Sequence, residues 1–136
     1  MKFDKLSLAT YLSRLSPQVG VCLLLDNIRW IDRNCDKLSR LKIENLKELN
    51  LNNNSIACEG IRILTENSSW AWLEVLHLVN NRIKNLGMMY LGKCKWAKLK
   101  CLILLDNMFS DEGVRDFLAR DWITIEYLDL RTKRTP

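Results

Sequence analysis

The sequence lacks the residue spacings that build metal sites and disulfide frameworks. Its 136 residues include one histidine and an odd number of cysteines, and no two cysteines stand in a Cys-x-x-Cys pattern. A metal site needs several such ligands at close spacing, so we expect no metal and no cofactor. The odd count favours free thiols in a reducing compartment, either the cytoplasm or, for a secreted effector, the cytosol of a host cell. The five cysteines are Cys22, Cys35, Cys58, Cys94 and Cys101.

Long apolar runs and low-complexity tracts are also missing. Polar residues interrupt residues 1–30, so these lack the core of a signal peptide, and no stretch approaches the length of a membrane span. Two prolines and five glycines leave no composition typical of a linker. We therefore expect one structural unit with no membrane association.

What the sequence does contain is a repeated pattern. Residues 46–64 follow Leu46-x-x-Leu49-x-Leu51-x-x-Asn54 and continue through a glycine into an apolar segment. The same pattern returns over 73–91 and 99–117, after steps of 27 and then 26 residues, and begins again at Ile125. A fixed period of this size indicates a solenoid, in which each unit buries its apolar face against its neighbours.

Each position of the repeat has a physical role. The alternation in Leu49-Asn50-Leu51 predicts a short strand with both leucines on one face. The Asn that follows, as at Asn54, can satisfy backbone groups where the chain turns out of the sheet. A glycine in the next segment, as at Gly60, indicates close packing of a helix, since glycine is otherwise unfavourable there.

These residues resemble leucine-rich repeats of the ribonuclease-inhibitor kind over roughly residues 19–131. The resemblance implies an α/β fold, a short right-handed horseshoe with parallel strands on the concave face and helices on the convex face. It also implies an Asn ladder after the strands. Such proteins bind other proteins as adaptors or scaffolds, and we expect no enzymatic activity.

The first repeat is irregular. Cys22-x-Leu24-x-x-Asn27 keeps the Asn spacing, whereas Trp30 and Leu38 fit a step of 26 residues, so the strand register stays open by one residue. We take residues 19–136 as the repeat domain, with about four repeats and a terminal strand. Terminal repeats are commonly atypical.

Residues 1–18 are expected to cap the open N-terminal end of the core. Leu8, Tyr11, Leu12 and Leu15 share one helical face, which predicts an amphipathic helix over 4–16. An F-box-like docking helix is the alternative, and the absence of a Leu-Pro opening disfavours it.

Tryptophan also repeats in phase. Trp70, Trp96 and Trp122 each stand three residues before a strand. An aromatic groove for a peptide or nucleic acid would use such residues, but their locked phase favours a stacked column that closes the core.

The net charge of +5 raises the question of a polyanionic partner. Basic residues cluster at 29–42, 93–100 and 131–134. The clusters lie on different repeats, and the sequence indicates no exposed aromatic residues among them. We therefore favour solvent-facing charges over a surface that binds RNA or another polyanion.

A catalytic site is poorly supported. His77 is expected to face outward, and Cys101 lies one strand over with backbones roughly 8 Å apart. Asp129 lies two strands away, and a Cys–His pair needs hydrogen-bond reach and an orienting third group. We expect no catalytic residues.

The outward residues of the later strands carry the positive functional signal. Outward positions of a half-buried sheet should be polar, yet here most are apolar over three strands, which is typical of an interaction surface. We expect a partner protein to bind this concave face, with Glu48 and Asn50 in its polar rim. A homodimer, through the same face or the terminal strand, is the alternative. The candidate contact residues are Val75, His77, Val79, Cys101, Ile103, Leu105, Asp106, Tyr127, Asp129 and Arg131.

Overall fold

The computed structural model describes residues 20–41, 43–67, 70–122 and 124–132, and within them a strand and a helix alternate along the chain. The strands are β1 (Val21–Leu24), β2 (Leu46–Asn50), β3 (Val75–His77), β4 (Cys101–Ile103) and β5 (Tyr127–Asp129). The helices are α2 (Asp32–Ser39), α3 (Cys58–Asn67), α4 (Asn85–Gly92) and α5 (Asp111–Leu118). The helix expected over 4–16 lies outside the described residues.

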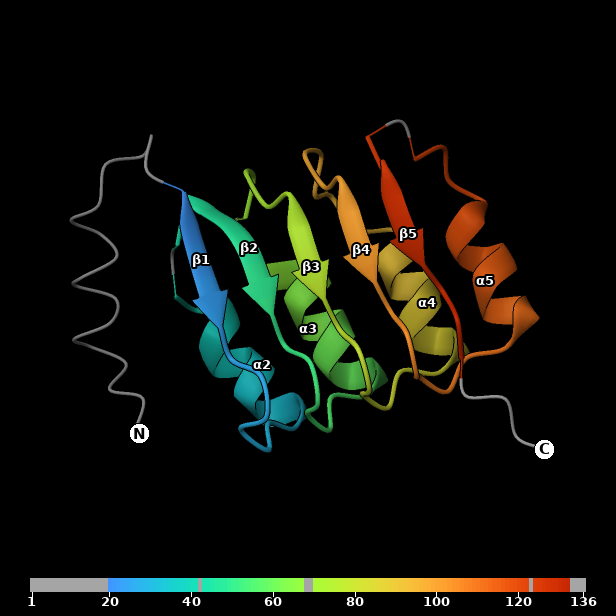
Figure 1. The fold of residues 1–136 in the computed structure, drawn as a ribbon, viewed down its shortest axis with the longest axis horizontal. Coiled ribbons are helices and arrows are strands. Elements are labelled where there is room, and N and C mark those ends of the chain that lie inside the picture. Colours follow the sequence, from blue (N-terminus) through green and yellow to red (C-terminus); the bar gives the residue numbers. More distant parts are fainter. Residues whose placement is uncertain (1–19, 42, 68–69, 123, 133–136) are drawn as a thin grey trace.

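The strands form one parallel sheet in chain order, β1 to β5. Figure 1 shows the helices side by side behind this sheet, all on the same face, while no described element covers the other face. We call this uncovered side the open face. The predicted α/β solenoid with parallel strands is confirmed.

The core lies between the sheet and the helices. Inward leucines of successive strands, such as Leu49, Leu76 and Leu102, pair across the ladder and are fully buried. Their burial against the helices supplies most of the stability expected of a repeat, because no unit can cover its own apolar face.

The predicted Asn ladder is present. Asn81 is buried, and its amide N–H donates to the Leu51 carbonyl of the preceding repeat at 3.0 Å. Its Oδ1 accepts the backbone N–H of Ile56 at 3.0 Å. Asn54 and Asn107 make the equivalent bonds one repeat earlier and one repeat later. Each Asn thus fastens the turn of one repeat to the repeat before it.

A second backbone ladder runs beside the first and was not expected. The residue before each Asn of the ladder, and Asn27 at the equivalent position of the first repeat, has a left-handed backbone, with φ between 53° and 60°. Its N–H donates to a carbonyl of the next repeat, as from Asn53 to Val79 at 2.8 Å. Asn and Asp tolerate this conformation best among the residues with a side chain. The four residues are Asn27, Asn53, Asn80 and Asp106.

The first repeat follows the 26-residue step, so the register based on Cys22 and Leu24 is wrong. Leu23 pairs with the inward Leu49, and Leu24 pairs with the outward Asn50. Leu24 is accordingly 64% exposed, while Leu25 is buried. The left-handed Asn27 belongs to the second ladder rather than the Asn ladder, which explains how its spacing misled the sequence interpretation.

The helices are held together at their N-terminal ends. Asp32 Oδ1 accepts the backbone N–H of Ala57 at 2.7 Å, and Asn85 Oδ1 accepts that of Ser110 at 2.8 Å. A Cβ at Gly113 would lie 2.4 Å from this Asn85 oxygen. The repeated glycine therefore gives each helix room to approach the polar group that anchors its neighbour.

The predicted tryptophan column is confirmed in part. Trp70 and Trp96 are buried and stacked, with ring centroids 5.9 Å apart. Trp122 is only partly buried and stacks on Phe117 at 4.8 Å. Its indole N–H donates to the Phe117 carbonyl at 3.0 Å. The column closes the core between repeats and leaves no aromatic groove at these positions.

Replacing Asn81 with Ala should lower the free energy of unfolding by about 1–3 kcal/mol, because buried backbone groups of the preceding repeat lose their partners. Chemical denaturation followed by circular dichroism measures this. Arg82→Ala, at the exposed neighbouring residue, is the control and should change stability by less than about 0.5 kcal/mol. Equal stability of the two variants would contradict the role assigned to Asn81.

Candidate functional site

Outward side chains form columns across the open face. One column, read from the strand pairing, contains Cys22, Glu48, Val75, Cys101 and Tyr127. A second column lies two residues further along each strand and contains Leu24, Asn50, His77, Ile103 and Asp129. A third column lies two residues further along and contains Asn52, Val79, Leu105 and Arg131. The columns place side chains from different repeats about 4.8 Å apart.

Six apolar side chains gather over β3, β4 and β5. Tyr127 is 54% exposed and the others are partly exposed, since neighbours in the columns shield them. Outward positions of the same columns over β2 are the polar Glu48 and Asn50. The apolar residues over β3 to β5 are therefore separated by the polar residues of β2 from Cys22 and Leu24 of β1. We call this set the apolar patch: Val75, Val79, Cys101, Ile103, Leu105 and Tyr127.

A hydrogen-bonded pair borders the apolar patch on the side of β2. His77 Nε2 lies 2.8 Å from Glu48 Oε1, and both side chains are partly exposed. Nε2 of His77, the only histidine in the sequence, therefore already has a hydrogen-bond partner. His77 is thus placed as a polar border of the apolar patch.

A second pair borders the apolar patch at β5. Arg131 Nη2 donates to Asp129 Oδ2 at 2.6 Å, and Arg131 Nε donates to Asp129 Oδ1 at 2.9 Å. These hydrogen bonds lower the pKa of the Asp129 carboxyl, and the exposed guanidinium covers it so that 7% of the carboxylate side chain remains accessible. Arg131, rather than Asp129, is the group that solvent or a partner meets.

Asp106 has a backbone role that the sequence interpretation missed. Its φ of 60° and its N–H bond to the Arg131 carbonyl place it in the second backbone ladder. The side chain is partly exposed beside the apolar patch. A substitution at Asp106 therefore changes the turn as well as the surface, which makes it a poor residue for testing binding.

The correction of the first register adds Leu24 to the open face. Leu24 and Cys22 are exposed at β1, on the far side of the polar residues of β2. The sequence left Leu24 unassigned, because the Asn27 spacing and the 26-residue fit of Trp30 and Leu38 give registers that differ by one residue. The stronger signal was the 26-residue fit of Trp30 and Leu38.

Cys101 lacks the surroundings that activate a nucleophilic cysteine. Burial, and then the negative charge of Glu48, raises the pKa of the Cys101 thiol. A catalytic cysteine needs a lowered pKa, because the thiolate is the nucleophile. All five cysteines are free thiols. No group of His, Cys, Asp and Glu side chains among the described residues is arranged to hold a metal ion.

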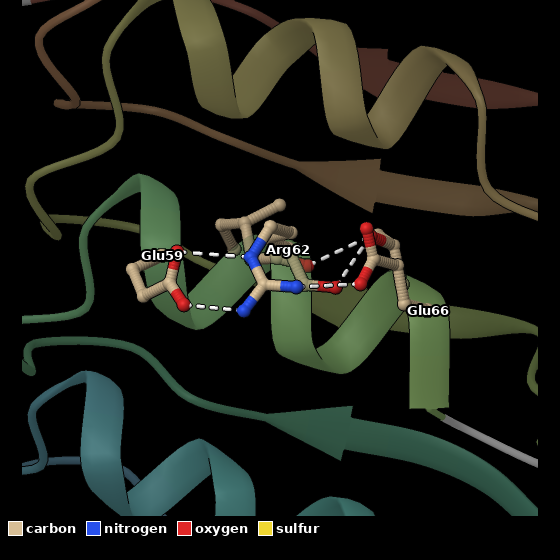
Figure 2. Close-up of polar contacts among 5 residues, drawn as sticks. Glu59, Arg62 and Glu66 are labelled. Carbon is tan, nitrogen blue, oxygen red and sulfur yellow. Dashed lines mark hydrogen bonds and ion pairs between the residues drawn. The ribbon is translucent and has the colours of Figure 1, made fainter.

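An ion-paired cluster lies on the helix side of the sheet, on α3. Figure 2 shows Arg62 on α3 between Glu59 and Glu66, with Nε donating to Glu59 at 2.9 Å and Nη1 donating to Glu66 at 2.6 Å. The hydrogen bonds from Arg62 lower the pKa of the Glu59 carboxyl. Exposed pairs of this spacing stabilise a helix slightly and leave little charge for a partner.

Comparison with known families agrees with the fold. A family model described as Leucine Rich repeat matches residues 42–62 and 71–92, which are the segments around β2 and β3. No curated protein matches the chain. Within the part of the chain that the structure describes, every helix is too short or too polar to cross a membrane.

Alkylation by iodoacetamide should label Cys22 first in the native protein, because it is exposed whereas Cys35 and Cys94 are buried. Burial raises the pKa of Cys35 to about 12. Partial burial and then the Glu48 carboxylate raise the pKa of Cys22, so its labelling rate should keep increasing above pH 9. Mass spectrometry of labelled peptides over a pH series measures both effects.

Glu48→Gln tests how much the Glu48 carboxylate contributes to the raised pKa of Cys22. Removing the negative charge should lower the pKa of Cys22 and speed its labelling at pH 8, with Cys35 unchanged. The denatured, unreduced protein should titrate as five thiols. Rapid native labelling of Cys35 would contradict the closed core described for the first repeat.

Proposed function

We propose that this leucine-rich repeat protein is a non-enzymatic module that binds a partner protein through its open face. The observation that carries the proposal is the apolar patch, at outward positions that a free sheet would fill with polar side chains. Leucine-rich repeats are typical of protein interaction, and the family match supports this class of function.

The energetics favour a partner over exposure to solvent. Full burial of a large apolar side chain is worth roughly 1.5–3 kcal/mol relative to exposure, and most side chains of the apolar patch are already partly buried. A partner therefore gains a fraction of this from each residue, with the largest share at Tyr127, which is 54% exposed. Aromatic side chains of this kind commonly carry much of the energy of an interface.

The dimensions of the apolar patch suggest the shape of the bound element. From the first to the third column the sheet extends four residues, or about 13 Å, and β3 to β5 span about 10 Å. An α-helix with side chains is about 10–12 Å across. We propose that one amphipathic helix of the partner lies across the strands, bordered by the Glu48–His77 pair and by Arg131.

Self-association is the second candidate. A hollow of about 550 Å³ lies along β5 and is lined by Tyr127–Arg131, next to the apolar patch. A second copy could cover this region and the apolar patch together. Analytical sedimentation at low protein concentration distinguishes the two candidates. A monomeric mass would exclude a tight homodimer.

The double variant Ile103→Asp with Leu105→Asp should abolish association, because it places two charges in the middle of the apolar patch. The melting temperature should fall by less than about 5 °C, since both side chains face outward and are only partly buried. Affinity purification with quantitative mass spectrometry identifies partners retained by the wild type and lost from the variant.

A matched control places the same chemistry on the helix side. Leu86→Asp with Leu118→Asp changes two exposed leucines of α4 and α5 and should keep every partner. The proposal fails if the open-face variant is folded and still retains the same partners or the same oligomeric state. It also fails if both double variants lose them equally, because the loss would then follow from added charge alone.

A further inference from the structure

The net positive charge of the chain is concentrated on one edge of the coil. Four segments lead from a helix back to the next strand, and we call them together the return edge. They are residues 40–47, 67–74, 93–100 and 119–126. The residues of these segments that the structure describes include seven Lys or Arg against four Asp or Glu, in a chain whose net charge is +5. The opposite segments, 25–32, 51–58, 78–85 and 104–111, carry three basic and four acidic residues. The two edges therefore differ in sign.

Three lysines of the return edge keep their charge available. Lys47 and Lys100 lie 4.0 and 3.8 Å from the two oxygens of one carboxylate, that of Glu74. Lys93, Lys95 and Lys98 are exposed, and none of the three makes an ion pair with a carboxylate of the described residues.

An exposed aromatic ring lies beside Lys98. Trp72, in the turn before β3, is 54% exposed, and the Lys98 ammonium lies over its ring at 5.8 Å from the centroid. Two features of the sequence disfavour a polyanionic partner, namely basic clusters on different repeats and the lack of exposed aromatic residues among them. Trp72 removes the second objection. A cation–π contact at this distance is near its outer limit and is easily exchanged for another partner.

We infer that the return edge binds single-stranded nucleic acid, with Trp72 stacking on a base and Lys93, Lys95 and Lys98 contacting phosphates. Stacking on an exposed aromatic ring accepts any base, and ammonium groups beside it follow the backbone. When a base stacks on Trp72, Lys98 can move from the ring to the adjoining phosphate.

The surroundings of Trp72 favour this partner over a membrane or an acidic protein. Within the described part of the return edge, Trp72 is the only large apolar side chain that is exposed. Insertion into a membrane interface uses a whole apolar face, and a protein interface has a core of several apolar groups. One flat ring with the Lys98 ammonium over it lacks both, whereas base stacking with phosphate contacts needs only a ring and nearby cations.

Fluorescence anisotropy with a fluorescein-labelled oligouridine of 12 nucleotides tests the inference. We expect weak binding, with a Kd of about 1–100 μM, and a plot of log K against log salt with a slope of about −2 for three phosphate contacts. Trp72→Ala should weaken binding about 5- to 150-fold with little change in the slope. Lys93→Gln, Lys95→Gln and Lys98→Gln together should remove most of the slope.

The matched control removes the same charge elsewhere. Arg33→Gln, Lys37→Gln and Arg115→Gln change three exposed basic residues on the helices and should leave the affinity and slope near those of the wild type. Circular dichroism must show that all variants are folded. The inference is overturned if the RNA does not bind, if Trp72→Ala and the lysine triple bind as the wild type does, or if both triples weaken binding equally. Binding to vesicles with anionic lipid or to polyglutamate, but not to RNA, overturns it as well.

Discussion

The hydrogen bonds of the buried asparagine side chains hold the coil together where each strand ends. At these turns the backbone leaves the sheet inside a protein core, and its N–H and C=O groups would otherwise be buried without partners. Asn81 satisfies groups of two repeats at once, through Leu51 and Ile56 on one side and Val79 on the other. No apolar side chain could do so, and a longer polar one would not fit the same buried space. The spacing of the repeats therefore depends on this residue type.

Fixing the turns in this way separates stability from function. The inward leucines and the Asn ladder hold neighbouring repeats together, and outward apolar side chains such as Ile103 take no part in either. Asn52 differs, because its Oδ1 accepts the backbone N–H of Val79 in the next repeat. Outward residues can then differ from repeat to repeat without disturbing the core. The polar Asn50 and the apolar Ile103 occupy the same column, two strands apart. Such variation at fixed geometry is what a binding surface requires, because the backbone presents each side chain at a known place.

The features that follow the repeat period could be predicted from the sequence, and the features that depart from the period could not. The inward leucines, the Asn ladder and the order of strands and helices all follow from a pattern that repeats three times. The register of β1 did not follow, because Asn27 stands one residue before the ladder position and is held by its left-handed backbone instead. Two asparagines side by side, as in Asn53-Asn54, are ambiguous in sequence when only one of them is buried.

The candidate site was harder to predict than the fold, since it depends on side chains that do not repeat. The strand alternation placed Val75 and Ile103 on the outward side, but pairing within the surface cannot be read from alternation. The Asp129–Arg131 pair lies two residues apart on one strand and withdraws the carboxylate from the surface. Trp72 was overlooked because it stands between Trp70, which does repeat, and Leu73, so its exposure became evident only with the turn in three dimensions.

The lysines of the return edge need an explanation beyond helix stability. The C-terminal end of a helix attracts cations, but this effect falls off within the last turn. Lys93 is the C-cap residue of α4 and is explained in this way. Lys95 and Lys98 lie beyond the helix end, and the last turns of α3 and α4 contain no basic residue at all. Helix electrostatics would have placed the cations inside those turns. Their position instead, on an exposed segment beside Trp72, is the arrangement that contact with an external anion favours.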